Sequence, residues 1–344
     1  MTSDLELSDL ELGTHDDEWR ALAAEVGNVF ATPEWLGTWW RHFGSGRRLL
    51  LTACRRPDGT LVAVLPLYVW RRNPLRAVRF LGHGPGDALG PVCRLEDRPS
   101  VARALERRLE ASRVALLVAD NLPRDEGWSE LLGARVLEEE ASPVLAFDGR
   151  DWESLLASWS KNLRSQVRSR ERKLKAEHDV EFRLADDPER FGDDLDTLFA
   201  LHRRRWTDES GFSRAEPFQR EFASLALARG WARLWLLEVD GEPRAAWYGF
   251  RLAEVESYYQ AGRDLDWDAY STGFVLLVHS MREAAADGAR EYRFLRGDEP
   301  FKFRFASHDH GLETFVLPRG LAGRASLRVA LALPRRLLRV VAAS

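Results

Sequence analysis

The residues best suited to chemistry lie near the carboxyl end of the chain. The segment RFLRGDEPFKFRFAS alternates aromatic and charged residues as a strand does, but Gly297 and the following proline interrupt the run. Asp298 and Glu299 come directly after this glycine, and Lys302 follows shortly. Ligands of α/β folds bind at strand ends. We therefore expect this corner to lie beside a ligand site, in a strand that pairs with the strand containing Tyr258.

A second candidate is the start of an apolar helix over 271–287. Ser271 and Thr272 precede the helix, and Phe274 lies on its apolar face. The hydroxyl groups alone explain such a start, because they satisfy the first amide groups of a helix. Alternatively, Gly273 lets a phosphate group approach those amides, which the helix dipole favours. The sequence leaves both interpretations open.

A basic stripe marks a third candidate, on a helix predicted over 160–175. Its cations recur at helical spacing: Lys161, Arg164, Arg168, Arg172 and Lys175. Like charges at this spacing repel one another. One interpretation is a solvated face that acids from elsewhere neutralise. The other is a surface for a polyanion, namely coenzyme phosphates, a nucleic acid or an anionic membrane.

Other motifs give weaker evidence for a functional site. GHGPG (82–86) has no helix after it, and its proline offers no amide to a phosphate, so we predict a turn. SHDH (307–310) provides two histidines and one acid without a further partner, and no metal site is expected. The chain has no G-x-S-x-G and no Walker loop.

The totals exclude several classes of protein. With 344 residues, 45% of them hydrophobic, the chain can form two domains with sizeable cores. A net charge of −4 gives no general attraction to nucleic acid, and no DNA partner is expected. Two cysteines are too few for a disulfide framework. The acidic start predicts no signal peptide, and no apolar run is long enough to span a membrane, so a cytoplasmic location is expected.

The order of predicted elements gives a mixed α/β fold in two units. Residues 1–150 alternate strands and helices. Residues 151–318 contain two or more helices, a three-stranded antiparallel meander over 233–263, the apolar helix and two final strands. Residues 319–344 are basic. The recurrence of helix and strand predicts two copies of a similar α/β unit.

Residues from about 150 to 317 resemble the acetyltransferase domain of the GNAT superfamily. Within it they are similar to a bacterial branch associated with cellulose and exopolysaccharide biosynthesis, which is related to the Fem-type aminoacyltransferases. Four segments carry the resemblance: SKNLRSQVRSRERKLKAEHDVEFRL, LHRRRWTDESGF, VDGEPRAAWYGFRLAEVESYYQAGRDLDWDAYSTGFVLL and DGAREYRFLRGDEPFKFRFA. Residues 1–150 would form a degenerate first copy of the same fold. The resemblance thus implies two GNAT-like domains in tandem, each with a mixed, mostly antiparallel sheet flanked by helices.

The resemblance implies transfer of an acyl group, chiefly acetyl, from an acyl-CoA thioester to an amine, without a metal. A sugar or polysaccharide precursor is the implied acceptor. Asp298 or Glu299 would bind the amine or act as base, and Tyr258 or Tyr259 would protonate the thiolate, although only one of two adjacent strand residues faces a cleft. The expected cofactor-binding residues are Ser271, Thr272, Gly273, Phe274, Arg164 and Arg168. The expected substrate-binding residues are Lys302, Arg205, Trp206 and Arg296.

Two other functions stay open. One is a Fem-like transferase that takes its acyl group from an aminoacyl-tRNA, with the basic helix on RNA phosphates. The other is a catalytically silent partner of a polysaccharide-synthesis complex at the inner membrane. In that case the tail 319–344, with six arginines and no acid, would contact anionic lipid.

Overall fold

A computed structural model describes residues 5–71, 76–206, 210–321 and 323–325. The chain divides into two units. The first comprises residues 1–26, 30–139 and 312–344, and the second comprises residues 27–29 and 140–311. Most of the expected basic tail therefore lies outside the described residues. Among the described residues, no helix has both the length and the apolar character needed to cross a membrane.

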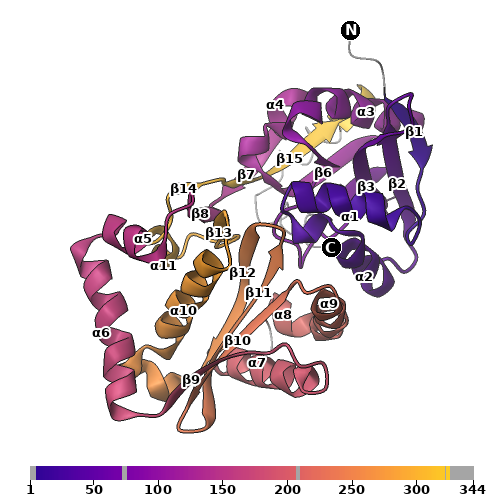
Figure 1. Cartoon of the computed structure of the whole chain (residues 1–344). Helices are drawn as coiled ribbons and strands as arrows, with labels where there is room; N and C mark the ends of the chain where they lie inside the picture. The colour runs from indigo at the N-terminus through magenta and orange to yellow at the C-terminus, as the bar shows by residue number, and fades with distance from the viewer. Residues whose placement is uncertain (1–4, 72–75, 207–209, 322, 326–344) are drawn as a thin grey trace. The chain divides into compact units, whose positions relative to one another are not determined.

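The first unit is built on a mixed sheet with helices beside it (Figure 1). Its strands are β1 (Glu6–Asp9), β2 (Arg48–Arg55), β3 (Leu61–Arg71), β4 (Ala77–Phe80), β5 (Val92–Cys93), β6 (Leu116–Pro123), β7 (Arg135–Glu140) and β15 (Leu312–Pro318). Its helices are α1 (Asp16–Glu25), α2 (Pro33–Phe43), α3 (Arg98–Ala111) and α4 (Trp128–Leu132). The tryptophan-rich α2 forms where the sequence predicts a helix, with Thr32 as its N-cap, and buries Trp35 and Trp39.

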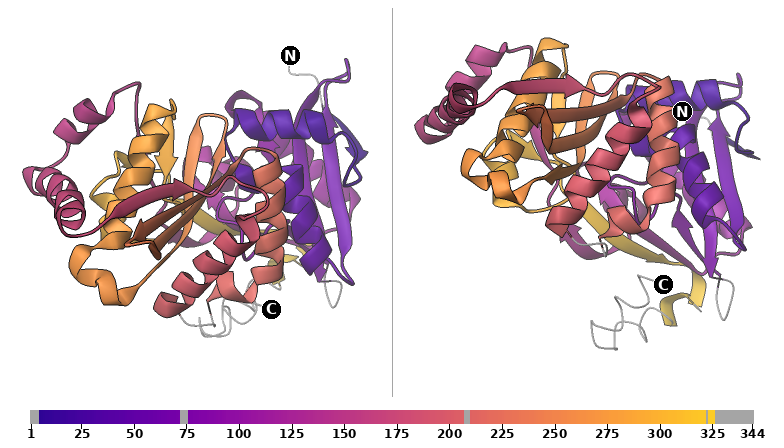
Figure 2. Two further views of the ribbon diagram at one scale, coloured as in Figure 1. Left: turned by 60° about the horizontal axis from the view of Figure 1, so that its bottom comes forward. Right: turned by 90° about the horizontal axis from the view of Figure 1, so that it is seen from below.

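The second unit repeats this architecture. Its strands are β8 (Pro143–Ala146), β9 (Val180–Leu184), β10 (Ala232–Val239), β11 (Glu242–Leu252), β12 (Val255–Arg263), β13 (Glu291–Arg293) and β14 (His308–Asp309). Its helices are α5 (Trp152–Ser158), α6 (Lys161–Glu177), α7 (Phe191–Trp206), α8 (Gly211–Arg214), α9 (Glu216–Ala228), α10 (Thr272–Ala286) and α11 (Pro300–Phe303). Helices α5, α6 and α10 cover one face of the sheet, and α7 and α9 cover the other (Figures 1 and 2).

The two sheets have the same strand order. One runs β1-β2-β3-β4-β6-β15-β7 and the other runs β9-β10-β11-β12-β13-β8-β14. Each has one parallel pair in its middle, β4 with β6 and β12 with β13, and the helix between the paired strands is α3 or α10. The predicted fold class is therefore confirmed: a mixed α/β protein with two mostly antiparallel sheets flanked by helices. The expected pairing of the strand after the apolar helix with the last meander strand is also confirmed.

The chain exchanges one strand between the units. Strand β8 precedes the helices of the second unit and pairs with β13, whereas β15 follows the second unit and pairs with β6 of the first sheet. The strand that the sequence suggests for the end of 151–318 thus belongs to the first sheet. The units meet near 140 and 311 in the chain, not at 150 and 318, because a local apolar pattern does not specify which sheet a strand joins.

His279 on α10 gives the second unit a measurable dependence on pH. The ring stacks on Phe182 at 4.0 Å between centroids and lies 4.7 Å from Trp235. Burial, together with the positive charge of Arg282, lowers the pKa of His279 to about 4. The folded protein therefore holds this ring neutral in a range where the unfolded chain protonates it.

We predict that the contribution of His279 to stability is present above pH 6.5 and is lost as the pH falls towards 4. The loss is at most about 1.4 kcal/mol per pH unit, because only the unfolded chain takes up the proton. Urea unfolding at several pH values should show a flatter pH dependence in His279→Gln than in the parent protein. The exposed His15, replaced by Asn, is the control. Equal pH dependence in all three proteins would contradict the prediction.

Candidate functional site

The second unit contains a cavity of about 280 Å³ on the α10 side of its sheet. Strands β11 and β12 form its floor, α10 and α11 form its walls, and α6 and α7 each contribute an arginine. Its lining includes small residues on the strands, Ala246, Ala261 and Gly262. Gly262 is required there, because a Cβ atom would lie 2.4 Å from the His202 backbone nitrogen of α7. The cavity thus lies beside the close contact of β12 with α7 and beside the amino end of α10.

The cavity lies where two parallel strands separate. Strands β12 and β13 pair over only three residue pairs, which end at Ser257 and Arg293. Beyond the last of these pairs, the amide of Phe294 donates to the Pro143 carbonyl of β8 at 2.9 Å. Strand β12 continues past this point with Tyr258, and the β11–β12 register shifts by one residue there. Such a bulge re-aims side chains and leaves the extra residue unpaired.

The amino end of α10 opens on the cavity. Ser271 has left-handed backbone angles, and its side chain makes no capping hydrogen bond. Its carbonyl accepts from the amides of Phe274 and Val275. Within the described residues, no backbone hydrogen bond uses the amides of Thr272 or Gly273. The hydroxyl groups therefore do not satisfy this helix start. Thr272 is fully buried and lies outside the cavity lining, so of these two amides only that of Gly273 is available to an anion in the cavity.

Four guanidinium groups line the same cavity, those of Arg170, Arg205, Arg263 and Arg304. Arg263 pairs with Asp268, whereas the other three have no carboxylate partner among the described residues. The lining itself contains no acidic residue. An acidic protein therefore has here a pocket with excess positive charge, which favours a polyanionic ligand.

Phe274 holds two of these arginines. The guanidinium of Arg170 lies 4.6 Å from the centre of the Phe274 ring and that of Arg304 lies 5.9 Å from it. Burial and the nearby charge of Arg304 lower the pKa of Arg170. A bound anion would relieve this repulsion between like charges. Gly273 leaves space for an anion next to Phe274, because a side chain there would place its Cβ atom only 3.2 Å from Cδ of Arg263.

The two tyrosines have separate surroundings. Tyr258 lines the cavity, and burial raises its pKa to about 12, so its hydroxyl stays protonated at neutral pH. Tyr259 is buried among Phe212, Phe250 and Tyr248, and its hydroxyl accepts a hydrogen bond from Gln219 at 2.8 Å. Of the two predicted acids, only Tyr258 reaches the cavity.

The segment around Gly297 is a turn that connects β13 to α11. The backbone leaves β13 after Arg293 and turns into α11, so this stretch is a short strand followed by a tight turn. Lys302 is buried, donates to the Arg296 carbonyl at 2.6 Å and pairs with Glu299 at 2.9 Å. Burial tends to raise the pKa of Glu299, but the bond to Lys302 lowers it, so the carboxylate stays ionised.

Several predicted residues lie outside the cavity lining. Arg164 donates to the carbonyls of Ala157 and Trp159 at the end of α5, and Arg168 pairs with Glu153 at 3.3 Å. Arg296 pairs with Glu140 at 3.6 Å.

The remaining predicted side chains divide between the surface and the cavity. Asp298 and Trp206 are exposed, and Arg205 stacks on Trp206 while lining the cavity.

The sequence analysis missed Arg170, Arg263 and Arg304. Arg170 was detectable, because it lies three residues after Val167 and four before Leu174, on the apolar face of α6. A cation on an apolar face needs an explanation, whereas the stripe of solvent-facing cations does not. Arg263 and Arg304 follow a strand and a short helix, and only the fold brings them to α10.

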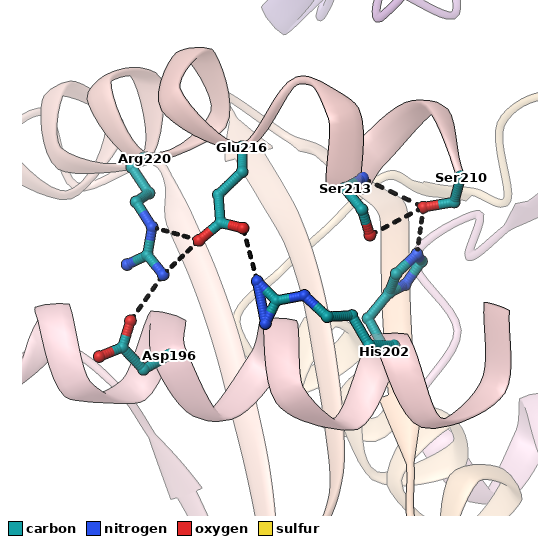
Figure 3. Close-up of polar contacts among 7 residues, drawn as sticks. Asp196, His202, Ser210, Ser213, Glu216 and Arg220 are labelled. Carbon is teal, nitrogen blue, oxygen red and sulfur yellow. Dashed lines mark hydrogen bonds and ion pairs between the residues drawn. The ribbon is translucent and has the colours of Figure 1, made fainter. Parts of the chain in front are cut away.

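A polar network fixes α7, which supplies Arg205 to the cavity. Figure 3 shows His202 with its Nε2 3.0 Å from Ser210 Oγ. Its Nδ1 lies 3.0 Å from the Ala261 carbonyl of β12, so that nitrogen carries the proton. Glu216 accepts from Arg203 and Arg220 at 2.6 Å each (Figure 3). These contacts join α7 to β12, α8 and α9, behind the cavity.

The corresponding point of the first unit is filled by the chain's own side chains. Strands β4 and β6 also pair in parallel over three residue pairs. The Arg79 side chain is fully buried there, 3.5 Å from Asp120, and its Nη1 donates to His83 Nε2 at 2.6 Å. Burial lowers the pKa of His83 to about 3, which keeps the ring neutral as an acceptor. The guanidinium at this point is thus paired within the protein.

The second unit has a helix start that faces a cavity beside the point where β12 and β13 separate, and the two units share one strand order. Both features can be compared with known proteins. Residues 161–303 match the model of the acetyltransferase (GNAT) domain. The match includes α6, α10 and the Gly297 corner, and therefore every charged residue of the cavity except Arg304, which follows it directly. No curated protein matches the chain.

Solved structures resemble the whole chain in fold. FemX is similar over 91% of this chain and 97% of its own, with a TM-score of 0.64 and 13% identity. L-PGS from Bacillus licheniformis is similar over 96% of this chain and 98% of its own, with a TM-score of 0.55 and 14% identity. These matches extend the likeness beyond the GNAT domain to both units.

We predict that Gly297→Ala destabilises the protein by at least about 2 kcal/mol. Gly297 has a φ of 123°, and a Cβ atom there would lie 2.3 Å from Glu299 Oε2 and 2.9 Å from Lys302 Nζ. The Glu299–Lys302 pair would have to separate.

The control is Gly288→Ala, where φ is 74° and no atom lies within 4 Å of the added Cβ. This variant has a strained backbone without the clash and should lose only about 1 kcal/mol. Urea unfolding of both variants measures the difference, and equal losses would show that the Gly297 corner is not closely packed.

Proposed function

We propose that the second unit is an N-acyltransferase that takes its acyl group from acyl-CoA, chiefly acetyl-CoA, and transfers it to an amine. The observation that carries the proposal is the cavity at the amino end of α10, which is lined by four arginines and by Gly273, whose amide makes no backbone hydrogen bond within the described residues. A diphosphate is the group that such a set of donors fits. The match of residues 161–303 to the GNAT domain supports the same reaction class.

In this proposal the carrier's diphosphate lies at Gly273, near Arg263 and Arg170. The arm that bears the thioester extends along β12, where Ala261 and Gly262 leave room, towards Tyr258. The separation of β12 from β13 after Ser257 supports this path, because the edge of β12 is not paired with β13 beyond it. Positioning of this kind removes several kcal/mol of the barrier to reaction.

The proposed chemistry is direct acyl transfer. The amine nitrogen attacks the thioester carbonyl and forms a C–N bond, and a backbone amide at the β12 bulge stabilises the oxyanion. The C–S bond then breaks, and Tyr258 gives its proton to the leaving thiolate and regains one from water. The amine's proton passes to Glu299, directly or through water. The ionised state of Glu299 suits it to bind an ammonium group or to accept this proton.

The proposed acceptor is an amino sugar or a precursor of an exopolysaccharide, and the proposed location is the cytoplasm, where acyl-CoA is available. The acceptor rests on the sequence resemblance, and the location rests on the expectation drawn from the composition and the start of the sequence. Arg205, Arg296 and Trp206 remain proposed acceptor contacts, and the first two are held by Trp206 and Glu140. Asp298 is exposed and remains a proposed amine contact.

A second candidate function is transfer from aminoacyl-tRNA. The likeness to FemX over both units favours this donor. The solvent-facing side of α6 also favours it, because the cations Lys161 and Arg172 are exposed there. In that case the cavity would hold the phosphates at the end of the RNA. The third possibility, membrane contact through 319–344, falls mostly on residues outside the described ranges.

We predict that Arg170→Gln weakens binding of coenzyme A by about tenfold, because it removes one charged hydrogen-bond donor from the cavity. Isothermal titration calorimetry of the full chain with coenzyme A measures the change. Arg168→Gln is the matched control, since Arg168 lies on the same helix and pairs with Glu153 at the surface. Its affinity should stay within about twofold of the parent value.

Two results would overturn the acyl-CoA proposal. One is that the parent protein fails to bind coenzyme A but binds tRNA with an affinity that falls steeply with salt, which would favour the aminoacyl-tRNA donor. The other is that Arg168→Gln weakens binding more than Arg170→Gln, which would move the anion site to the outer face of α6.

We also predict that Tyr258→Phe lowers kcat by about a hundredfold and leaves KM for acetyl-CoA nearly unchanged, because the hydroxyl acts on the leaving thiolate. Release of thiol from acetyl-CoA, with glucosamine as a test acceptor, gives the rate. Tyr259→Phe is the control: it removes the Gln219 hydrogen bond and should cost stability, about 1 kcal/mol, rather than rate. Equal rates for the parent and Tyr258→Phe would exclude Tyr258 as the acid.

A further inference from the structure

We propose that Glu291, His308 and His310 form a binding site for a divalent transition-metal ion of the zinc class. Each residue offers one ligand atom, and these atoms all lie within 4.8 Å of one another. The Nε2 atom of His310 lies 3.8 Å from Oε2 of Glu291. Ligand atoms on a tetrahedral zinc ion are separated by roughly 3.3 Å. The ligand atoms of these three residues would therefore have to approach one another by at most about 1.5 Å to bind one ion.

The backbone holds both histidines in place. The amide of Ser307 donates to the Val144 carbonyl at 2.7 Å, and His308 is in register with Val144 in the β14–β8 ladder. Between the histidines, Asp309 Oδ1 accepts from the amides of Ser142 at 2.7 Å and Gly311 at 2.8 Å.

Because Asp309 is held by these two hydrogen bonds, the rings of His308 and His310 lie close to each other on one side of the segment. Alternate residues of an extended segment share a side, and the rings of His308 and His310 lie 4.9 Å apart between centroids. The ring pair is therefore fixed by backbone bonds that do not depend on a metal.

The carboxylate of Glu291 is oriented by Arg293. Oε1 accepts from Nε of Arg293 at 3.0 Å and from its Nη2 at 2.6 Å, which leaves Oε2 on the side of His310. An outer partner that fixes a ligating carboxylate is a common feature of metal sites.

The donor set determines the class of metal. Two imidazoles and one carboxylate suit Zn²⁺ and its neighbours Co²⁺ and Ni²⁺, whereas Mg²⁺ and Ca²⁺ prefer oxygen alone. Three protein ligands leave a fourth position for water. Because Glu291 lies on β13 and the histidines lie next to Gly311, an ion would join β13 to the segment through which the chain leaves the second unit. We expect a stabilising role, separate from the α10 cavity.

Titration of the untagged full chain with ZnCl₂, in competition with a chromophoric chelator, tests the proposal. We expect one tightly bound ion per chain, and at least about tenfold weaker binding in His308→Gln and in His310→Gln. His15→Asn, which removes an exposed histidine of the first unit, should bind as the parent does. Zinc should also raise the Tm of the parent and the control, but not of the two variants.

Substitution with Co²⁺ gives a second readout that does not depend on folding stability. A four-coordinate site gives a visible absorption band, and Glu291→Gln should weaken or remove it. If Zn²⁺ binds with no defined stoichiometry, or if His15→Asn and His308→Gln bind it equally, the site does not exist. Circular dichroism of each variant identifies loss of fold, and a folded variant with parent affinity would overturn the assignment of that ligand.

Discussion

The candidate site depends on one feature of the second sheet, which is how early β12 and β13 separate. The two strands share only three residue pairs, and just beyond them the amide of Phe294 donates to the Pro143 carbonyl of β8. If the parallel pairing continued, β13 would occupy the space beside Tyr258. Strand β8 pairs with β13 on its other side, and beyond Ser257 the edge of β12 at the cavity is no longer paired with β13.

The electrostatics of the site follow from that geometry. Helix α10 begins beside the open part of β12, and no side chain caps it. The unsatisfied amides, the helix dipole and four arginines add positive potential in one hollow, in a chain whose net charge is −4. The first unit has the same strand separation, but Arg79 there is paired with Asp120 and His83. One topology thus appears twice, and in the second copy the arginines line a cavity in place of a buried ion pair.

Local sequence patterns predicted much of this fold. The meander with its Asp240–Gly241 turn, the apolar helix α10 and the tryptophan-rich α2 each have a periodicity or a turn signal that fixes them. The exchange of β8 and β15 was not predictable in this way, because both strands are short apolar runs that fit either sheet. For the site, Gly273 was found from a helix start, whereas Arg263 and Arg304 have no local signal. Arg164 and Arg168 were chosen because they form a stripe, but a stripe facing solvent binds nearby acids and carbonyls instead.

A crystal structure of the full chain with coenzyme A tests the central claim most directly. The account predicts diphosphate oxygens within hydrogen-bond distance of the Gly273 amide and of Arg263 or Arg170, with the thiol end beside Tyr258. Coenzyme A bound elsewhere, or a cavity that stays closed by its own side chains at saturating coenzyme A, would contradict the account.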